Sequence, residues 1–296
     1  MPAPRRSIRI APIRPAPGRI KACWCWQSEW VLQPDLVADF CRDSYIDLLF
    51  IPYSKTYSVE QWKTLISACS VNGVEVHALH GDAKWGLAAY QADGFKKIDD
   101  VMYYNREVDP GAKFTGIHLD VEPHSLDEWD SPETLPQLLK EWVENMKAFA
   151  ARSRSYGMAF GADFAAWLDT NAAVIAATPP EWGKPLFEIM IDIVDTFGCM
   201  SYSDKAQGMI DLAAGEVAYP DSPKVLVGAE LTQQLPASIT FFEEGVLAME
   251  DAIRQADEQF KTSAGYAGVA VHDFEDYELT RRRFIPKPAK RKLPPR

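Results

Sequence analysis

The segment that decides the fold reads TGIHLDVEP over residues 115–123. Apolar and polar residues alternate along it, and this alternation indicates a β-strand, because successive side chains of a strand point to opposite faces. The apolar residues on one face suit packing under helices. The other face carries three ionisable side chains, which are His118, Asp120 and Glu122. We therefore expect a strand that turns an imidazole and two carboxylates toward the interior of a sheet.

Seven other short apolar runs are typical of buried strands, and they alternate with longer segments of helical periodicity such as Leu135–Ser153 and Gly245–Phe260. Strands separated by helices predict parallel pairing, and eight such units predict an α/β fold of one closed (β/α)₈ TIM barrel. A doubly wound open sheet is the alternative, but no glycine-rich phosphate loop follows the first predicted strand. The predicted strands are Ile20–Trp26, Ile46–Tyr53, Val74–His80, Thr115–Glu122, Gly157–Phe164, Ile193–Tyr202, Val225–Glu230 and Gly268–Asp273.

Charge is distributed unevenly along the 296 residues. Residues 1–21 carry six basic side chains and residues 281–296 carry eight, with no acid in either segment, whereas the rest of the chain holds 17 basic and 42 acidic residues. A body that acidic repels polyanions, so we expect no nucleic-acid partner. We predict that residues 1–19 and 281–296 are flexible, proline-containing basic tails around a single barrel domain at residues 20–280.

Other features bear on the location of the protein. No apolar run approaches the roughly 18 residues of a membrane span, and the N-terminal segment lacks the apolar core of a secretory signal. Five cysteines without a CxxC pair or a Cys/His cluster predict free, buried thiols. We therefore expect a cytoplasmic protein with no membrane partner, and the sequence leaves the oligomeric state open. The basic run at residues 290–292 is either a nuclear address or part of a solvated tail.

The active face of a TIM barrel lies at the carboxyl ends of its strands. Glu122 is the last inward side chain of the quoted strand, and Asp120 lies one step below it. Two carboxylates this close repel each other, which should raise the pKa of one and so provide a proton donor near neutral pH. The alternative is a buried salt-bridge network without chemistry. The scarcity of cations disfavours it, because Lys21 is the only Lys or Arg in the eight predicted strands.

The quoted strand resembles the Asp-Gly-x-Asp-x-Asp-x-Glu signature of the chitinase-like family 18 glycoside hydrolases. Gly116, Asp120 and Glu122 match this signature, whereas Thr115 and His118 stand in place of the first two acids. A second match is MSYSD at residues 200–204, which is similar to the family's Met-x-Tyr-x-Asp. The resemblance implies a TIM barrel and a glycosidase activity.

The resemblance also implies roles for individual residues. Glu122 would protonate the glycosidic oxygen, Asp120 would orient a 2-acetamido group that attacks the anomeric carbon, and Tyr202 would hydrogen-bond the developing oxazolinium. Asp204 would contact the substrate. At the end of the eighth strand His272 replaces the Trp that floors the family's sugar site. The sequence therefore favours a small glycoconjugate or glycosylated metabolite over an insoluble polymer.

Strand-end positions add further polar and aromatic groups to the same rim. We expect the substrate to contact a set of side chains that comprises His118, Asp204, Asp163, Glu230, His272, His80, Trp85 and Tyr53. The four side chains that could instead hold Mg²⁺ or Mn²⁺ are Glu122, Asp163, Glu230 and His272. A tight ligand pair is missing from this set, so we predict no metal and no cofactor.

The sequence thus predicts an enzyme that acts on a small glycan with a carboxylic general acid at the end of the fourth strand. Two alternatives remain open. One is a barrel that uses the same groups for non-hydrolytic acid–base chemistry, such as elimination, isomerisation or cyclisation of a small metabolite, which imidazoles such as His118 and His272 would support. The other is a carbohydrate-binding barrel without catalysis, which the two replaced acids and the replaced Trp motivate.

Overall fold

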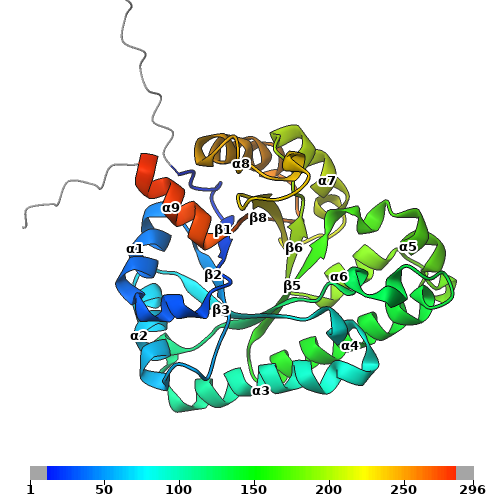
Figure 1. The fold of residues 1–296 in the computed structure, drawn as a ribbon, viewed down its shortest axis with the longest axis horizontal. Coiled ribbons are helices and arrows are strands. Elements are labelled where there is room, and N and C mark those ends of the chain that lie inside the picture. The colour runs from blue at the N-terminus through cyan, green and yellow to red at the C-terminus, as the bar shows by residue number, and fades with distance from the viewer. Residues whose placement is uncertain (1–11, 285–296) are drawn as a thin grey trace, which may run out of the picture.

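The computed structural model describes residues 12–284 and contains one closed barrel of eight parallel strands in sequential order (Figure 1). Each strand pairs with the next one along the chain, and β8 closes the barrel against β1. The predicted fold class is therefore confirmed. The strands are β1 Ile20–Trp24, β2 Leu48–Ile51, β3 Glu75–Gly81, β4 Gly116–Asp120, β5 Ala159–Ala165, β6 Thr196–Met200, β7 Val225–Glu230 and β8 Tyr266–His272.

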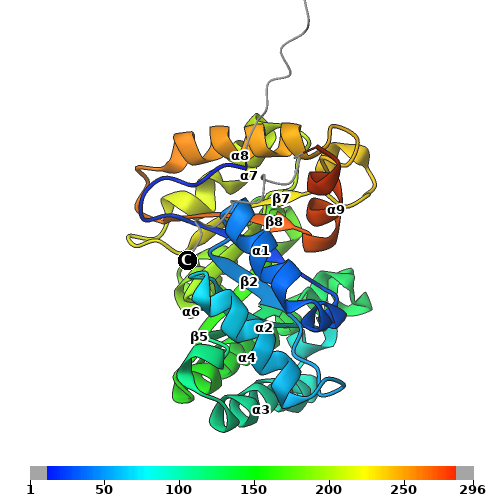
Figure 2. The same ribbon diagram turned by 90° about the vertical axis from the view of Figure 1, so that its left-hand side faces the viewer.

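Helices surround the barrel in both views, as a right-handed β–α–β crossover requires (Figures 1 and 2). The two segments of helical periodicity form α4 and α8, with ends that differ from the predicted ones by one or two residues. The helices of the described residues are α1 Pro34–Ser44, α2 Val59–Val71, α3 Gln91–Glu107, α4 Leu135–Ser155, α5 Ala172–Ala177, α6 Leu186–Ile193, α7 Ala206–Ala218, α8 Val246–Phe260 and α9 Phe274–Phe284.

The core has two layers, because strand side chains alternate between the barrel interior and the helices. Ile117 and Leu119 of β4 belong to the large outer layer, as the alternation predicts. The apolar part of the interior is small and consists of Ala22, Trp24, Leu48, Phe50, Leu79, Leu226 and Ala270. His118 stacks on Phe50 inside the barrel, with ring centroids 3.8 Å apart.

The boundary of the predicted N-terminal tail differs from the structure. Ile13 is buried, its N–H donates to Oε2 of Glu250 on α8 at 2.9 Å, and the N–H of Ala16 donates to Oδ2 of Asp257 at 3.0 Å. Buried acids on α8 thus hold residues that the sequence assigns to a flexible tail. At the other end α9 extends four residues into the second predicted tail. Residues 1–11 and 285–296, including the basic run at 290–292, lie outside the described residues.

All five cysteines are buried thiols, as predicted. Burial raises the pKa of the Cys69 thiol to about 12, and it also raises the pKa of Cys23 and Cys199. These three thiols are therefore protonated packing groups at neutral pH. Within residues 12–284, no helix is long and apolar enough to cross a membrane.

Lys21 points out of the barrel and does not reach the carboxyl ends of the strands. Its ammonium is fully buried between β1 and the helices, 2.8 Å from Oε1 of Glu250 and 2.9 Å from the Tyr277 hydroxyl of α9. The single cation of the predicted strands therefore fastens α8 and α9 to β1. It leaves the inward carboxylates without a lysine or arginine partner from any strand.

We predict that Lys21→Met destabilises the fold by about 3–5 kcal/mol, because it leaves the Glu250 carboxylate buried without its cation. Equilibrium urea unfolding at pH 7 measures this loss. The double variant Lys21→Met/Glu250→Leu should recover most of it, since both charges are then absent. Equal losses in the single and double variants would show that the pair is not the cause.

Candidate functional site

A cavity of about 690 Å³ opens at the carboxyl ends of the strands, and we call it the mouth cavity. Six strands contribute side chains to it, together with the loops that follow them. Its lining consists of Trp24, Trp26, Asp120, Glu122, His124, Asp163, Ala165, Ala166, Trp167, Met200, Tyr202, Leu212, Glu230, Gln234, Ile239 and His272. Four carboxylates and two imidazoles therefore meet at one place without a lysine or arginine in the lining.

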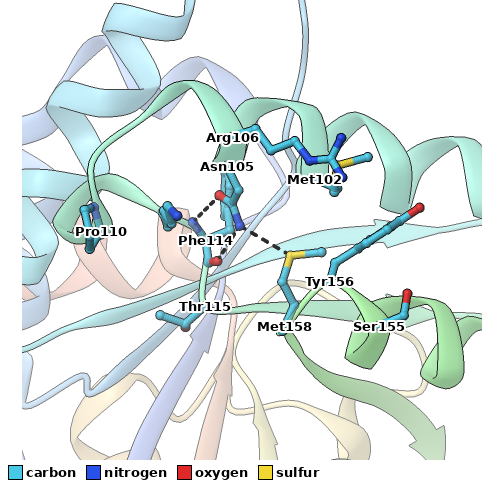
Figure 3. Close-up of a pocket in the computed structure, with 11 residues that line it drawn as sticks. Met102, Asn105, Arg106, Pro110, Phe114, Thr115, Ser155, Tyr156 and Met158 are labelled. Carbon is cyan, nitrogen blue, oxygen red and sulfur yellow. Dashed lines mark hydrogen bonds between the residues drawn. The ribbon is translucent and has the colours of Figure 1, made fainter.

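A second cavity, of about 520 Å³, lies near the amino ends of β4 and β5 (Figure 3). Its lining includes Asn105 and Arg106 of α3, Thr115, and Tyr156 at the end of α4. No Asp, Glu or His lines it, so it offers no acid–base pair. Of these two cavities, the mouth cavity is therefore the one that can support acid–base chemistry.

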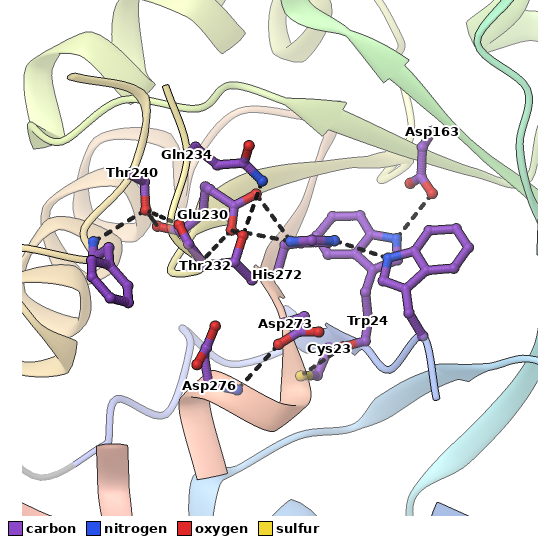
Figure 4. Close-up of polar contacts among 12 residues, drawn as sticks. Cys23, Trp24, Asp163, Glu230, Thr232, Gln234, Thr240, His272, Asp273 and Asp276 are labelled. Carbon is purple, nitrogen blue, oxygen red and sulfur yellow. Dashed lines mark hydrogen bonds and ion pairs between the residues drawn. The ribbon is translucent and has the colours of Figure 1, made fainter. Parts of the chain in front are cut away.

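Asp163 of β5 is the deepest carboxylate of the mouth cavity and is held from two sides. Trp24 donates its indole N–H to Oδ2 at 2.9 Å (Figure 4). On the other side, Nε2 of His118 lies 2.7 Å from Oδ1. Burial raises the pKa of Asp163 and lowers the pKa of His118 to about 3. The imidazole is therefore neutral. One proton lies in the hydrogen bond between Nε2 of His118 and Oδ1 of Asp163.

Two glycines make room for this pair. A Cβ atom on Gly161 would lie 2.4 Å from Nδ1 of His118, and one on Gly198 would lie 2.0 Å from Oδ1 of Asp163. Any larger residue at either position would displace the pair. Branched apolar side chains usually fill the interior of such a barrel. Here the interior is instead shaped around an imidazole and a carboxylate.

Asp120 and Glu122 have pKa shifts of opposite sign. Burial, with the charges of Asp163 and Glu122, raises the pKa of Asp120, and Oδ1 of Asp120 is buried without a hydrogen-bond partner. Glu122 is also partly desolvated, but its contacts with His124 and Asp120 outweigh that burial and lower its pKa. One pKa of the pair is raised, as expected, yet the raised one belongs to Asp120. A proton on the pair is therefore favoured on Asp120 rather than on Glu122.

His124 is the contact that distinguishes Glu122 from the other carboxylates. Its Nε2 lies 3.1 Å from Oε2 of Glu122. The imidazole packs edge-on against Trp167, with ring centroids 5.1 Å apart, and against Trp129 at 6.0 Å. His124 follows Pro123 in a short 3-10 turn beyond β4, where strand alternation no longer applies. Sequence reasoning therefore missed it.

A second polar chain closes the other side of the mouth cavity. The Trp26 indole N–H donates to Nε2 of His272 at 2.8 Å, and Nδ1 of His272 lies 3.0 Å from Glu230, which also accepts the N–H and hydroxyl of Thr232 (Figure 4). Because an indole only donates, Nε2 accepts and His272 carries its proton on Nδ1. Burial lowers the pKa of His272, but Glu230 outweighs it and raises that pKa. A second proton on His272 would break the contact with Trp26.

Tyr202 lies after β6 with its ring centroid 6.2 Å from that of His272. Burial raises its pKa, and the charges of Glu230, Asp163, Asp120 and Glu122 raise it further. The phenol therefore stays protonated and can donate a hydrogen bond to a ligand. The aromatic side chains of the lining, which are Trp24, Trp26, Trp167 and Tyr202, provide flat apolar surfaces beside the carboxylates.

The structure brings together six of the predicted site residues and separates the others. Those that line the mouth cavity are Asp120, Glu122, Asp163, Tyr202, Glu230 and His272. His118 lies directly beneath them. Asp204 is outside the lining, and its N–H donates to the carbonyl of Ser238 at 2.9 Å.

Three predicted residues lie outside the barrel, which corrects their placement at the same mouth. His80, Trp85 and Tyr53 line a separate cavity of about 700 Å³ that α3 also borders. His77 and Leu79 of β3 point into the barrel. His80 follows Leu79, and side chains alternate along a strand, so His80 faces the helices. Tyr53 and Trp85 both belong to the outer apolar layer.

No three His, Cys, Asp or Glu side chains in the described part of the chain are arranged to hold a metal ion together. The alternative set of Glu122, Asp163, Glu230 and His272 therefore gains no support. Gln234, which donates to Thr232 at 3.0 Å, is a lining residue that the sequence did not indicate. It lies in the loop after β7, where no periodic pattern places it.

The fold resembles those of solved chitinases and of a spore cortex-lytic enzyme at very low sequence identity. A class V chitinase from Pseudomonas fluorescens Pf-5 matches with a TM-score of 0.58 and 11% identity, over 88% of this chain and 98% of the other. A chitinase from Chromobacterium violaceum ATCC 12472 matches with a TM-score of 0.56 and 8% identity, over 91% and 100%. The spore cortex-lytic enzyme SleL of Bacillus megaterium QM B1551 matches with 0.56 and 11%, over 90% and 75%.

These likenesses confirm the chitinase-like barrel that the sequence resemblance implies. No protein-family profile matches the chain, and no curated protein matches it either. At such identities the comparisons establish the fold, and the chemistry must be argued from the residues of the mouth cavity.

We predict that Trp24→Phe lowers the free energy of unfolding by about 1–3 kcal/mol, because the buried Asp163 carboxyl loses the indole donor while the ring remains. Urea unfolding at pH 7 measures the change. Trp26→Phe is the matched control. It removes an indole N–H from a half-buried position, where water can replace it, and should cost less. A larger loss for Trp26→Phe would contradict this assignment.

Proposed function

We propose that the protein is a glycoside hydrolase in which Glu122 protonates the leaving oxygen of a small glycan held in the mouth cavity. The single observation that carries this proposal is the placement of Glu122 beside Asp120 at the wall of a cavity lined by aromatic rings. The likeness of the fold to chitinases and to SleL supports the same reaction class.

The protonation states define what each group does. The lowered pKa of Glu122 favours its carboxylate, so Glu122 must first receive a proton, and the raised pKa of Asp120 makes this neighbour the donor. When the glycosidic oxygen approaches, transfer from Asp120 to Glu122 leaves Glu122 as the acid and Asp120 as a carboxylate. That carboxylate can then orient a polar group on the sugar or stabilise positive charge at the anomeric carbon.

The surrounding groups fit a sugar ligand. Tyr202 is a protonated phenol that can donate to the substrate, and the partly exposed Trp26 and Trp167 provide surfaces on which a sugar ring can stack. His272 occupies the end of β8, where its Nε2 binds Trp26. His272 stands where the chitinase-like family has a Trp. It still holds an indole at the mouth cavity, because it accepts a hydrogen bond from Trp26.

We predict that the purified protein hydrolyses at least one member of a panel of aryl glycosides that includes N-acetylhexosaminides. Glu122→Gln should lower kcat by about 10²–10⁴-fold, because the amide cannot donate an acidic proton, while the substrate still binds. Release of the aryl alcohol measures the rate, and calorimetry on the variant measures binding. Glu133→Gln, the same change at an exposed position, is the matched control and should leave kcat unchanged.

Other outcomes would point elsewhere. Sugar binding that Glu122→Gln leaves unchanged, with no turnover by the wild type, would indicate a carbohydrate-binding barrel. A protein that neither binds nor cleaves any glycoside would contradict the proposal. It would favour non-hydrolytic acid–base chemistry on another metabolite.

A further inference from the structure

We propose that His124 is a positioning residue for Glu122, one that fixes the Glu122 carboxylate and sets the pH range over which it can hold a proton. This inference rests on the proposed function for its catalytic meaning. The contact between the two side chains is a property of the chain that can be measured without turnover.

The geometry carries the inference. Nε2 of His124 lies 3.1 Å from Oε2 of Glu122, and both side chains are about one third exposed, 28% for His124 and 34% for Glu122. Both line the mouth cavity. A ligand that touches Glu122 therefore meets the His124–Glu122 pair rather than an isolated carboxylate.

The imidazole is also fixed in place. Trp167 packs against it at an interplanar angle of 78° and Trp129 at 73°, and the two indoles contact each other with centroids 5.9 Å apart. Pro123 begins the 3-10 turn that presents His124, and its ring fixes the backbone φ there. The hydrogen-bonding nitrogen is thus aimed at Glu122 by packing, not only by the contact itself.

Other titratable groups face Glu122 and act differently. Asp120 lies below it on β4, Asp163 faces it from β5, Tyr202 follows β6 and His272 ends β8. The two aspartates bear negative charge when ionised, and Tyr202 is neutral. His272 is committed to Trp26 and Glu230. His124 is the imidazole in direct contact with Glu122, so its loss should affect Glu122 most.

The direction of the effect follows from simple electrostatics. An N–H donor, which becomes a cation when the imidazole is protonated, stabilises the carboxylate and lowers the pKa of Glu122. The acid role draws on the proton that Glu122 shares with Asp120, so activity falls as pH rises through the pKa at which the pair loses that proton. Removal of His124 takes a donor away from the ionised pair, so it should raise the pKa of Glu122 and of the pair and move the alkaline limb of the kcat/KM profile to higher pH.

The test uses two substitutions in the full chain. His124→Phe keeps a ring against the two indoles and removes the nitrogen, whereas His124→Gln keeps an N–H donor but cannot become a cation. We expect an upward shift of the alkaline limb on the order of one pH unit for His124→Phe and a smaller shift for His124→Gln. Glu133→Gln, at an exposed position outside the mouth cavity, is the control and should leave the limb in place. A fall in kcat with an unmoved limb would show a merely structural role and overturn the inference.

A readout without turnover separates this inference from the proposed function. Carbon-13 NMR of labelled glutamate carboxyls, with the Glu122 signal assigned by its loss in Glu122→Gln, follows the titration of Glu122 directly. An upward shift of its midpoint in His124→Phe supports the inference even if no glycoside is cleaved. A midpoint that stays within about 0.2 pH units of the wild-type value overturns it, whatever the activity.

Discussion

The structure depends on the need to satisfy ionisable groups that a closed barrel turns inward. A buried carboxylate is costly unless neighbours donate to it, and no strand supplies an inward lysine or arginine. Asp163 meets this need with the indole N–H of Trp24 on one oxygen and Nε2 of His118 on the other. Glycines on neighbouring strands leave the space that the pair occupies. This arrangement fixes the floor of the mouth cavity, on which Asp120 and Glu122 stand.

The same constraint divides the protons among the carboxylates. Asp120 is buried close to Asp163 and Glu122 without a cation of its own, which raises its pKa. Glu122 lies nearer the solvent and has an imidazole beside it, which lowers its pKa. Two neighbouring carboxyls whose pKa values are moved apart are a suitable starting point for general acid catalysis, because one can hold a proton that the other passes to a substrate oxygen.

Strand alternation accounts for most of what the sequence could predict. The inward face of β4, the eight-fold repeat and the convergence of Asp163, Glu230 and His272 all follow from a period of two and the parallel order of the strands. His80 is three residues after the inward His77 of β3. Alternation counted from His77 would therefore have predicted that His80 faces the helices. Tyr53 was misplaced because it lies beyond β2, where the chain has already left the sheet.

Contacts formed after the strands end could not be predicted in this way. His124 reaches Glu122 through a proline-initiated turn, and Gln234 reaches Thr232 from the loop after β7. Neither segment has a period that assigns a direction to its side chains. Nor does the sequence reveal that His118 would pair with Asp163, because the two lie 45 positions apart and meet only when β4 and β5 align.

The most direct measurement of the central claim is a crystal structure of Glu122→Gln soaked with the disaccharide of N-acetylglucosamine. The account predicts a sugar in the mouth cavity, stacked on an indole, with its glycosidic oxygen about 3 Å from the substituted side chain at position 122. A disaccharide bound outside this cavity, or with its glycosidic oxygen beyond reach of position 122, would contradict the account.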